Sequence, residues 1–435
     1  MSEFTVYPAS VRPHGCGKAY MLRDSQGKDW FVNCGITSPL DHKTAQVLRR
    51  EFPWTAPSRV LGLRKTLGTG DRTGLCAPGI LGGVGQTDAV PVPVQVSALE
   101  LNLSGQTWEE ALDAATFAVY REGYMGPWGA IADRLQSFGD MEAALAAGYT
   151  CLSVDCAPLL GRGEAPTEEL REQYQGRTFS VEGKQIAFDR LTLEDCCREY
   201  GQVITLVSEV FYAYTQRAEA DLEVLLNEAE TPTGAAGLYF LANELQRRGI
   251  AFQAICPRLG LPLEAASPLE EEAETLRKEL ELLHAVARSF GFKLSFRSLE
   301  HKESLLALLG EITGEQLHIT LGGVGWLEAM RLLARENPVL FRLSYGIALT
   351  ALPVARQVFP SSLDEAALPS LDGLEDRELP PLLTRTPVRQ LLELTYGQVL
   401  HSQLRDRLMS FWKAHADALC EQVKGQVKLN LDRLN

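Results

Sequence analysis

The chain has 435 residues, with 42 basic and 56 acidic side chains, which gives a formal net charge of −14. Hydrophobic residues make up 45 % of the sequence and charged residues 23 %, so the chain can bury a core and is not intrinsically disordered. The acidic balance disfavours a general nucleic-acid binder, which needs a basic face, and is otherwise typical of a soluble protein.

The cysteines and the apolar runs predict a reduced, cytoplasmic protein. The nine cysteines contain no C-x-x-C pair, and we interpret them as mostly buried free thiols. The first residues lack the basic and apolar regions of a signal peptide. No uninterrupted apolar stretch reaches the ~18 residues that a membrane helix needs. We therefore expect no nucleic-acid partner and no membrane contact.

The predicted elements alternate between strands and helices after an irregular start. Residues 1–57 are rich in proline and glycine and predict an N-terminal cap or meander. Short apolar runs predict strands at 90–97, 150–154, 251–256, 293–296, 317–321 and 339–343. Longer amphipathic segments predict helices at 107–121, 140–147, 191–223, 238–248, 268–289, 300–309, 326–334 and 388–424.

Glycines at the ends of the predicted helices indicate how these units connect. Gly148, Gly249 and Gly291 each follow a helical segment and precede a strand, as a C-terminal cap does. Such alternation implies parallel strands with right-handed crossovers. Six or more units fit an α/β fold of the (β/α)₈ TIM-barrel type better than an open sheet.

We expect three regions in this chain. Residues 58–350 form the barrel, and the polar segment 157–191 is an insertion in it. Residues 351–435 form a linker and a C-terminal helical region packed on the barrel.

The glycine-rich segment 67–85 offers a first candidate site. It lacks the spacing of a P-loop and of a dinucleotide-binding turn. Arg72 has a planar fork suited to a carboxylate or phosphate, and Asp71 could orient it. The alternative is a local turn that Asp71 and Arg72 stabilise by themselves.

Acidic residues follow two of the apolar runs. Asp155 comes directly after a predicted strand, at the end of a barrel where active sites are built, although it could also cap a helix. Glu223, Glu228 and Glu230 precede Pro232, which predicts a turn with two or three acids, and close carboxylates could hold a divalent metal or transfer protons. The alternative for these acids is a solvated acidic turn.

Two further strands carry polar candidates. His318 lies inside the apolar run 317–321 and is either a metal ligand or a hydrogen-bonded core histidine. Arg297, His301 and Lys302 follow the run KLSF, and Lys302 is a candidate acid, base or anion partner, or part of an exposed helix start. The residues alone therefore predict an α/β barrel with a polar mouth capable of binding a metal.

In the segments that carry these candidate residues, the chain resembles the tagaturonate/fructuronate epimerase family, and the resemblance extends from about residue 65 to the C-terminus. The family strings are close to GDRLGLATPGH, GADADHL, DETETPT, KLSLHSGSDK, HVKTAGTSYLEA and RQLLHITYGSVL. Their counterparts occur here in the same order: GDRTGLCAPGI (70–80), GAIADRL (129–135), NEAETPT (227–233), KLSFRSLEHK (293–302), HITLGGVGWLEA (318–329) and RQLLELTYGQVL (389–400). The resemblance implies a metal-dependent sugar-acid epimerase that inverts C4 of a 2-keto hexuronate.

Several polar residues of the family strings are replaced in this chain. Histidines of the family correspond here to Ile80, Arg134, Arg297 and Glu393. Other family positions are changed as well: Ile131 stands for an aspartate, His301 for an acid and Thr320 for a lysine. The matching residues that survive are Asp71, Arg72, Asp133, Asp155, Glu228, Glu230, Lys293, Lys302 and His318.

The resemblance assigns roles to these positions. It implies Asp155, Glu230 and Lys302 as catalytic residues. It implies substrate contacts for Asp71, Arg72, Lys293 and Arg297. Glu228, His318 and Asp155 remain as a reduced ligand set for a divalent metal such as Zn, Mn or Ni, and an arginine beside them would repel that metal.

Two hypotheses follow for this chain. The first is an epimerase of a sugar acid, with the family substrate or an altered one. The second is a catalytically silent relative that binds a sugar acid or a sugar phosphate. Both are compatible with a homo-oligomer.

Overall fold

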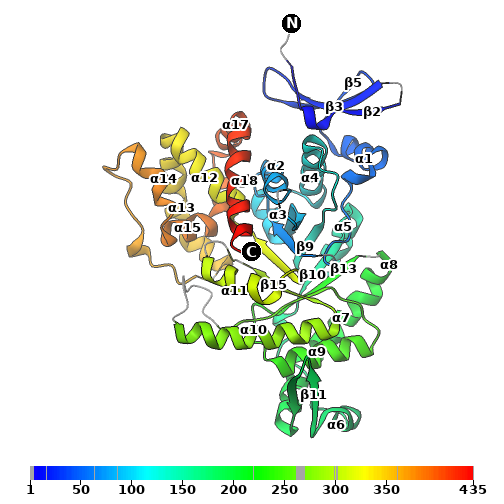
Figure 1. The fold of residues 1–435 in the computed structure, drawn as a ribbon. Helices are drawn as coiled ribbons and strands as arrows, with labels where there is room; N and C mark the ends of the chain where they lie inside the picture. The colour runs from blue at the N-terminus through cyan, green and yellow to red at the C-terminus, as the bar shows by residue number, and fades with distance from the viewer. Residues whose placement is uncertain are drawn as a thin grey trace.

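A nearly closed barrel of parallel strands forms the centre of the computed structural model (Figure 1). The structure describes residues 4–15, 17–62, 64–85, 87–218, 220–260, 270–297, 299, 302–359 and 361–434. The strands of the barrel, in chain order, are β6 (Thr66–Thr69), β7 (Val90–Val92), β8 (Val94–Ser97), β9 (Ala130–Leu135), β10 (Cys151–Asp155), β13 (Asp221–Leu225), β14 (Ala254–Cys256), β15 (Lys293–Arg297) and β16 (Leu317–Leu321).

The strand order explains how the barrel closes. The nine strands follow the path β7-β6-β16-β15-β14-β13-β10-β9-β8, and all neighbours are parallel. The two ends of this path, β7 and β8, are separated in sequence by Pro93 alone. Proline has no N–H to donate to a strand ladder, so Pro93 divides one strand of the barrel into the two segments β7 and β8. The two segments therefore count as one strand, and the barrel closes between them. The predicted (β/α)₈-type barrel is confirmed.

Helices follow the strands and cover the barrel. They are α2 (Ala77–Val84), α3 (Ala98–Ser104), α4 (Trp108–Glu122), α5 (Phe138–Ala147), α7 (Arg190–Val210), α9 (Ala235–Arg247), α10 (Glu270–Phe290), α11 (Glu303–Thr313) and α12 (Val324–Glu336). Gly148, Gly249 and Gly291 have φ values of 106°, 71° and 74° and end α5, α9 and α10, as predicted. The left-handed backbone at these positions favours glycine.

The amino-terminal end of the barrel is closed by apolar side chains. Val60 and Leu61, from the segment before β6, pack with apolar residues of four barrel strands. The strand residues of this cluster are Val90, Val92, Ile131, Cys151 and Ala254. The barrel interior is therefore plugged at this end, and a ligand has to enter at the carboxyl end, where active sites of such barrels lie.

Two predicted elements were wrong. The segment 191–223 is not one helix: α7 ends at Val210, continues through the π-helical turn η4 (Phe211–Thr215) and α8 (Gln216–Ala218), and gives way to strand β13. The predicted strand 339–343 lies in helix α13 (Pro338–Val358), because Pro338 occupies its first position and the Asn337 side chain caps it by accepting from Leu340 N–H.

Besides β13, two barrel strands escaped prediction, both for the same reason. Strand β6 has the sequence TLGT and strand β9 the sequence AIADRL, and neither is a continuous apolar run. Their polar residues face the barrel interior or its mouth, so the apolar pattern expected of a buried strand is absent.

The remaining segments surround the barrel. The N-terminal cap is an antiparallel sheet rather than an irregular meander: β1 (Thr5–Val6), β2 (Arg12–His14), β3 (Gly17–Arg23), β4 (Asp29–Asn33) and β5 (Ile36–Pro39), followed by α1 (His42–Glu51). The insertion holds α6 (Glu168–Tyr174) and the hairpin of β11 (Arg177–Val181) and β12 (Lys184–Phe188). Figure 1 shows the cap and this insertion at opposite ends of the molecule. Short 3₁₀ turns are η1 (Pro8–Ser10), η2 (Pro53–Thr55), η3 (Ala157–Leu159), η5 (Glu365–Ala367) and η6 (Asp376–Glu378).

The C-terminal region is helical, as predicted, but is divided. It contains α14 (Leu379–Leu382), α15 (Thr386–Leu394), α16 (Tyr396–Leu400), α17 (Arg405–Ala414) and α18 (Ala416–Asp432), so the predicted helix 388–424 spans parts of four helices. Helix α13 runs continuously through the expected boundary at 350/351. The three-region division itself stays a prediction.

Helix α18 lies directly against α2. A Cβ atom on Gly79 would come within 2.5 Å of the Cys420 carbonyl oxygen, and one on Gly83 within 2.8 Å of Val427. Only glycine lets the two helix backbones approach this closely. The C-terminal region is thereby packed onto the first helix of the barrel.

One helix of the described chain, α13, is long and apolar enough to cross a membrane by length and composition. The sequence analysis required an uninterrupted apolar stretch, and Arg342 and Arg356 interrupt this one. The mean hydropathy of the helix is nevertheless high enough to meet the criterion for a membrane span. Both arginines bind the segment that follows, at Leu371, Leu374 and Leu363 carbonyls. Core helices meet the same criterion, so the absence of membrane contact stays a prediction.

Candidate active site at the carboxyl end of the barrel

A buried ion-pair network occupies the centre of the barrel. Arg297, the last residue of β15, donates from Nη1 to Asp133 Oδ2 of β9 at 2.6 Å. Its Nη2 donates to Glu223 Oε2 of β13 at 2.7 Å and to Ser153 Oγ of β10 at 2.9 Å. The side chains of Arg297, Asp133 and Glu223 are 4 %, 7 % and 0 % exposed. One guanidinium therefore links three other strands across the barrel.

The environment keeps this guanidinium charged. Burial by itself would lower the pKa of Arg297, but the carboxylates of Asp133 and Glu223 more than offset it and hold that pKa above its ordinary value. Buried charges persist only when they are paired and hydrogen-bonded, and this one is paired twice.

Several polar atoms around this network have no hydrogen-bond partner among the described residues. They are both acceptors and donors: Asp133 Oδ1, Glu223 Oε1, Gln95 Nε2 and Arg297 Nε. Buried polar atoms are normally hydrogen-bonded, so either water or a bound molecule can complete these bonds. A mixture of donors and acceptors matches a hydroxylated ligand.

A second ion pair lies at the mouth of the barrel. Arg134 follows Asp133 in β9 and donates from Nη1 to Glu228 Oε1 at 2.8 Å, with side chains 39 % and 46 % exposed. Arg134 has a φ of +49°, which is left-handed backbone that costs a residue other than glycine about 1–3 kcal/mol. The pairing of β9 with β10 also shifts register here. The fold thus holds Arg134 over the mouth at the expense of local strain.

The other acids predicted for the site lie at the mouth but not in the central network. Asp155, the last residue of β10, is half-buried; it accepts from Gln136 Nε2 at 2.8 Å and from Ala157 N–H at 3.1 Å. Glu230 is exposed on the same turn as Glu228. Lys302 directly precedes α11 and is half-buried, and His301 lies outside the described residues.

His318 occupies the interior of the barrel below the mouth. It is fully buried, with Nδ1 2.9 Å from Thr66 Oγ1 and Nε2 3.2 Å from Gln95 Oε1. Burial, and then the positive charges of Arg297 and Lys293, hold its pKa well below the ordinary value, so the ring is neutral. This geometry is that of a hydrogen-bonded core histidine.

The predicted metal ligands are therefore not brought together. Glu228 is bound to Arg134, Asp155 to Gln136, and His318 faces Thr66 and Gln95. Within the described ranges, no group of three or more His, Cys, Asp and Glu side chains is arranged to hold a metal ion. The divalent metal stays a prediction, and the donor set at the mouth does not fit it.

Lys293 lies at the other end of the barrel from the mouth. As the first residue of β15, it donates from Nζ to the Arg64 carbonyl at 2.7 Å and contacts Thr66 Oγ1 at 3.4 Å. Burial lowers the pKa of Lys293 to about 7. The structure does not bring this residue to the mouth, so its predicted substrate contact has no support in the geometry.

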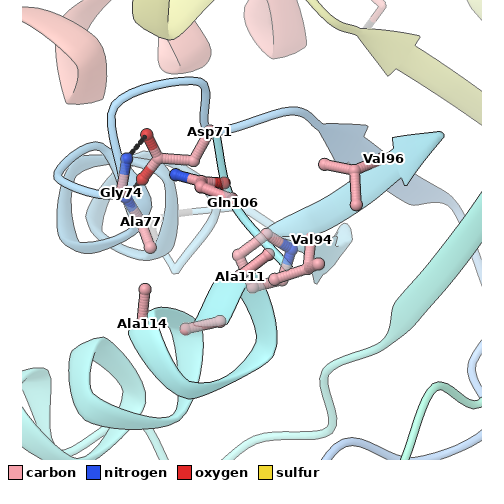
Figure 2. A pocket seen from close by; sticks show the side chains of 10 residues that line it. Asp71, Gly74, Ala77, Val94, Val96, Gln106, Ala111 and Ala114 are labelled. Carbon is pink, nitrogen blue, oxygen red and sulfur yellow. Dashed lines mark hydrogen bonds between the residues drawn. The ribbon is translucent and has the colours of Figure 1, made fainter. Parts of the chain in front are cut away.

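The carboxylate of Asp71 is occupied by its own loop. Its oxygens accept from the backbone N–H groups of Thr73, Gly74, Cys76 and Ala77 and from the Thr73 hydroxyl. Figure 2 shows the bond to Gly74. Asp71 thus shapes the turn into α2, as the local-turn alternative expected, and its role as a substrate contact stays a prediction.

Arg72 points in a different direction from Asp71. Its guanidinium stacks on the ring of Tyr396 at 3.9 Å, and Nη2 lies 3.9 Å from Glu100 Oε1. Its Nε and Nη1 are buried without a hydrogen-bond partner in the described part of the chain. Arg72 therefore keeps donors available, and its substrate contact also stays a prediction.

The cavity drawn in Figure 2 does not compete with the barrel centre as a substrate site. It lies between α2, α4 and β8 and has a volume of about 10 Å³. Its walls are mostly apolar, including Ala77, Val94, Val96 and Ala111. This volume is near the minimum for one water molecule and far below that of a sugar.

Sequence reasoning missed Ser153 as a site residue, because it looked like an ordinary residue of a buried strand. It did name Glu223 as a candidate, but grouped it with Glu228 and Glu230 near a turn instead of placing it inside the barrel. The signal that could have placed it correctly is the run DLEVL, where an acid in the middle of apolar residues faces the interior of a barrel.

Comparisons with known proteins agree on one group of relatives. The sequence model of a family described as tagaturonate epimerase matches residues 16–434. The tagaturonate/fructuronate epimerase of Thermotoga maritima is 31 % identical over 411 residues, which cover 91 % of this chain and 85 % of that protein. The native crystal structure of fructuronate-tagaturonate epimerase from Cohnella laeviribosi is 26 % identical, with a TM-score of 0.94, and covers 99 % of this chain and 96 % of that one. Its complex with one glycerol is 27 % identical, with a TM-score of 0.93 and the same coverage.

Proposed function

The chain belongs to the tagaturonate epimerase family, and on that premise we propose that it converts a 2-keto hexuronate at the carboxyl end of its barrel. The observation that carries this proposal is the set of unpartnered donors and acceptors around Arg297. A sugar acid supplies hydroxyl groups for these atoms and a carboxylate for a guanidinium.

The chemistry of such a substrate permits inversion at C4 without net oxidation. The C4 hydroxyl is β to the C2 ketone. When a base takes the hydroxyl proton, the C3–C4 bond breaks to give a C4 aldehyde and an enolate over C2 and C3. Bond formation on the other face of the aldehyde and return of the proton complete the inversion.

We assign the proton transfer to Asp155 and the stabilisation of negative charge to Arg134 and Arg297. Asp155 is the half-buried carboxylate at the mouth that is hydrogen-bonded to an amide rather than paired with an arginine. Arg297 binds Asp133, and Arg134, the next residue in the chain after Asp133, binds Glu228 at the mouth. Both guanidiniums supply fixed positive charge where the enolate develops and where the substrate carboxylate binds. No step is assigned to the Zn, Mn or Ni ion that the resemblance implies.

A second candidate function is binding without turnover, with a sugar acid or sugar phosphate as the ligand. The observation that favours it is the pairing of the carboxylates at this end of the barrel. Arg134 neutralises Glu228. Arg297 neutralises Asp133 and Glu223, so fewer free carboxylates remain for acid–base chemistry. Action on a sugar acid other than the family substrate is likewise a proposal. The cytoplasmic location and a homo-oligomeric state remain proposals from the sequence.

Turnover and binding should be measured on the same preparation. We would incubate the protein with fructuronate, with no metal and with Mn²⁺, Zn²⁺, Ni²⁺ or Mg²⁺ in turn, and follow tagaturonate by NMR. Asp155→Asn should lower the rate by about 10²–10⁴-fold with an unchanged Tm. Glu172→Gln, an exposed acid on α6, is the matched control and should leave the rate unchanged.

Each outcome selects one function. Turnover that Asp155→Asn abolishes supports the epimerase. Saturable binding of fructuronate by calorimetry without turnover supports the silent relative. Neither turnover nor binding in a folded sample overturns both.

A further inference from the structure

We propose that the guanidinium of Arg297 is a built-in cation of this barrel and occupies the position that a divalent metal would need between Asp133 and Glu223. The inference concerns the site of the proposed function, but its measurement is metal content. Its failure is therefore distinguishable from an absence of turnover.

The first argument is the use of the carboxylate oxygens. Asp133 Oδ2 and Glu223 Oε2 are directed at two different nitrogens of one guanidinium, at 2.6 Å and 2.7 Å. A divalent metal needs such oxygens at about 2.0–2.6 Å from its own centre. The planar fork of Arg297 already fills the space between them.

The second argument is charge. The remaining oxygens, Asp133 Oδ1 and Glu223 Oε1, belong to the same two carboxylates, so a metal bound to them would lie beside the guanidinium and be repelled by it. Arg134, which adjoins Asp133 in the chain, adds a second positive charge at the mouth.

The third argument is that, among the described residues, no third metal-ligating side chain converges on these two carboxylates. His318 is the histidine of the barrel interior, and its two nitrogens face Thr66 and Gln95. Across the described ranges no three metal-ligating side chains converge. A fixed cation is thus provided by the chain itself at a point where four strands meet.

The test compares metal uptake by the wild-type chain and two arginine variants. Each protein is equilibrated with Zn²⁺ and, separately, with Mn²⁺ and Ni²⁺, desalted, and analysed for metal by mass spectrometry. We expect no stoichiometric metal in the wild type. Arg297→His removes the guanidinium, adds an imidazole and frees two carboxylates, so it should retain about one equivalent of Zn²⁺.

The matched control is Arg59→His. Arg59 also pairs with a buried acid of β13, Asp221, at 2.8 Å, but at the amino-terminal end of the barrel and outside the candidate site. This variant frees one carboxylate and should take up no more metal than the wild type. Equal uptake by both variants would overturn the proposal.

The wild-type protein provides a second arm in case Arg297→His does not fold. We expect its Tm to be unchanged by Zn²⁺ and by a chelator. Stoichiometric metal in the wild type, or a rise in Tm with Zn²⁺ that Asp133→Asn abolishes, would show that these carboxylates bind metal and would refute the inference.

Discussion

Lys293 offers a quantitative test of how the barrel interior is organised. Its ammonium group lies at the closed end of the barrel, 4 % exposed, with Nζ bound to the Arg64 carbonyl. Burial lowers the pKa of Lys293 from 10.5 to about 7, and the charges of Asp221 and Glu315 offset only part of that effect. We predict that Lys293→Met removes a distinct pH dependence of stability.

The sign follows from proton binding in the two states. Between pH 7 and pH 10.5 the unfolded chain holds a proton on Lys293 that the folded chain has lost, so the free energy of unfolding rises with pH in that window. With pKa values of about 7 and 10.5, the rise from pH 7 to pH 9 is about 2 kcal/mol. Well below pH 7 both states hold the proton, and Lys293 contributes no slope.

The assay is urea unfolding at pH 7, 8 and 9, followed by tryptophan fluorescence. Other groups also titrate in this range, so the informative quantity is the difference between the wild type and Lys293→Met. That difference should change by about 2 kcal/mol across the series, with the wild type gaining stability relative to the variant as pH rises. Lys184→Met, at a partly exposed lysine paired with Glu281, should follow the wild type. Parallel pH curves for the wild type and Lys293→Met would refute the reasoning.

Two further predictions concern packing and backbone strain. Gly79→Ala should lower the free energy of unfolding by about 1–3 kcal/mol, because the new Cβ would lie 2.5 Å from the Cys420 carbonyl oxygen. Gly82→Ala is the control and should be near neutral, because its Cβ would meet flexible Lys424 carbons at 3.2 Å. Equal Tm values for the two variants would contradict this packing. Arg134→Gly and Arg134→Ala both remove the guanidinium, but glycine adopts the φ of +49° without strain, so the glycine variant should be more stable by about 1 kcal/mol in thermal unfolding. An alanine variant as stable as the glycine variant would show that this backbone is not strained.

The local signals in the sequence were sufficient for much of the fold. Thr107 followed by Glu110 forms a capping box at the start of α4, and Gly148 ends α5 in the left-handed conformation. Both depend on residues a few positions apart. Strand β13 was hidden because the apolar period of α7 runs into it through a π-helical turn, with no proline or glycine between them.

The candidate site was less accessible to sequence reasoning because its contacts are distant in the chain. Arg297 pairs with Asp133 and with Glu223, 164 and 74 positions away. The family strings pointed to positions 133 and 297 separately, but nothing in one sequence shows that the arginine binds both acids. The same limit applies to Asp71, whose oxygens serve its own turn rather than orienting Arg72.

The contact between α2 and α18 has a consequence for the synthesis of this protein. Helix α2 leaves the ribosome early, yet the atoms nearest to Gly79 and Gly83 belong to residues of α18. At the ~5–20 residues per second typical of translation, the covering helix follows tens of seconds later. During that interval this apolar, glycine-lined face of α2 lacks its partner helix. Completion of the fold is therefore a post-translational step, and a chain truncated before α18 leaves that face permanently without its partner helix.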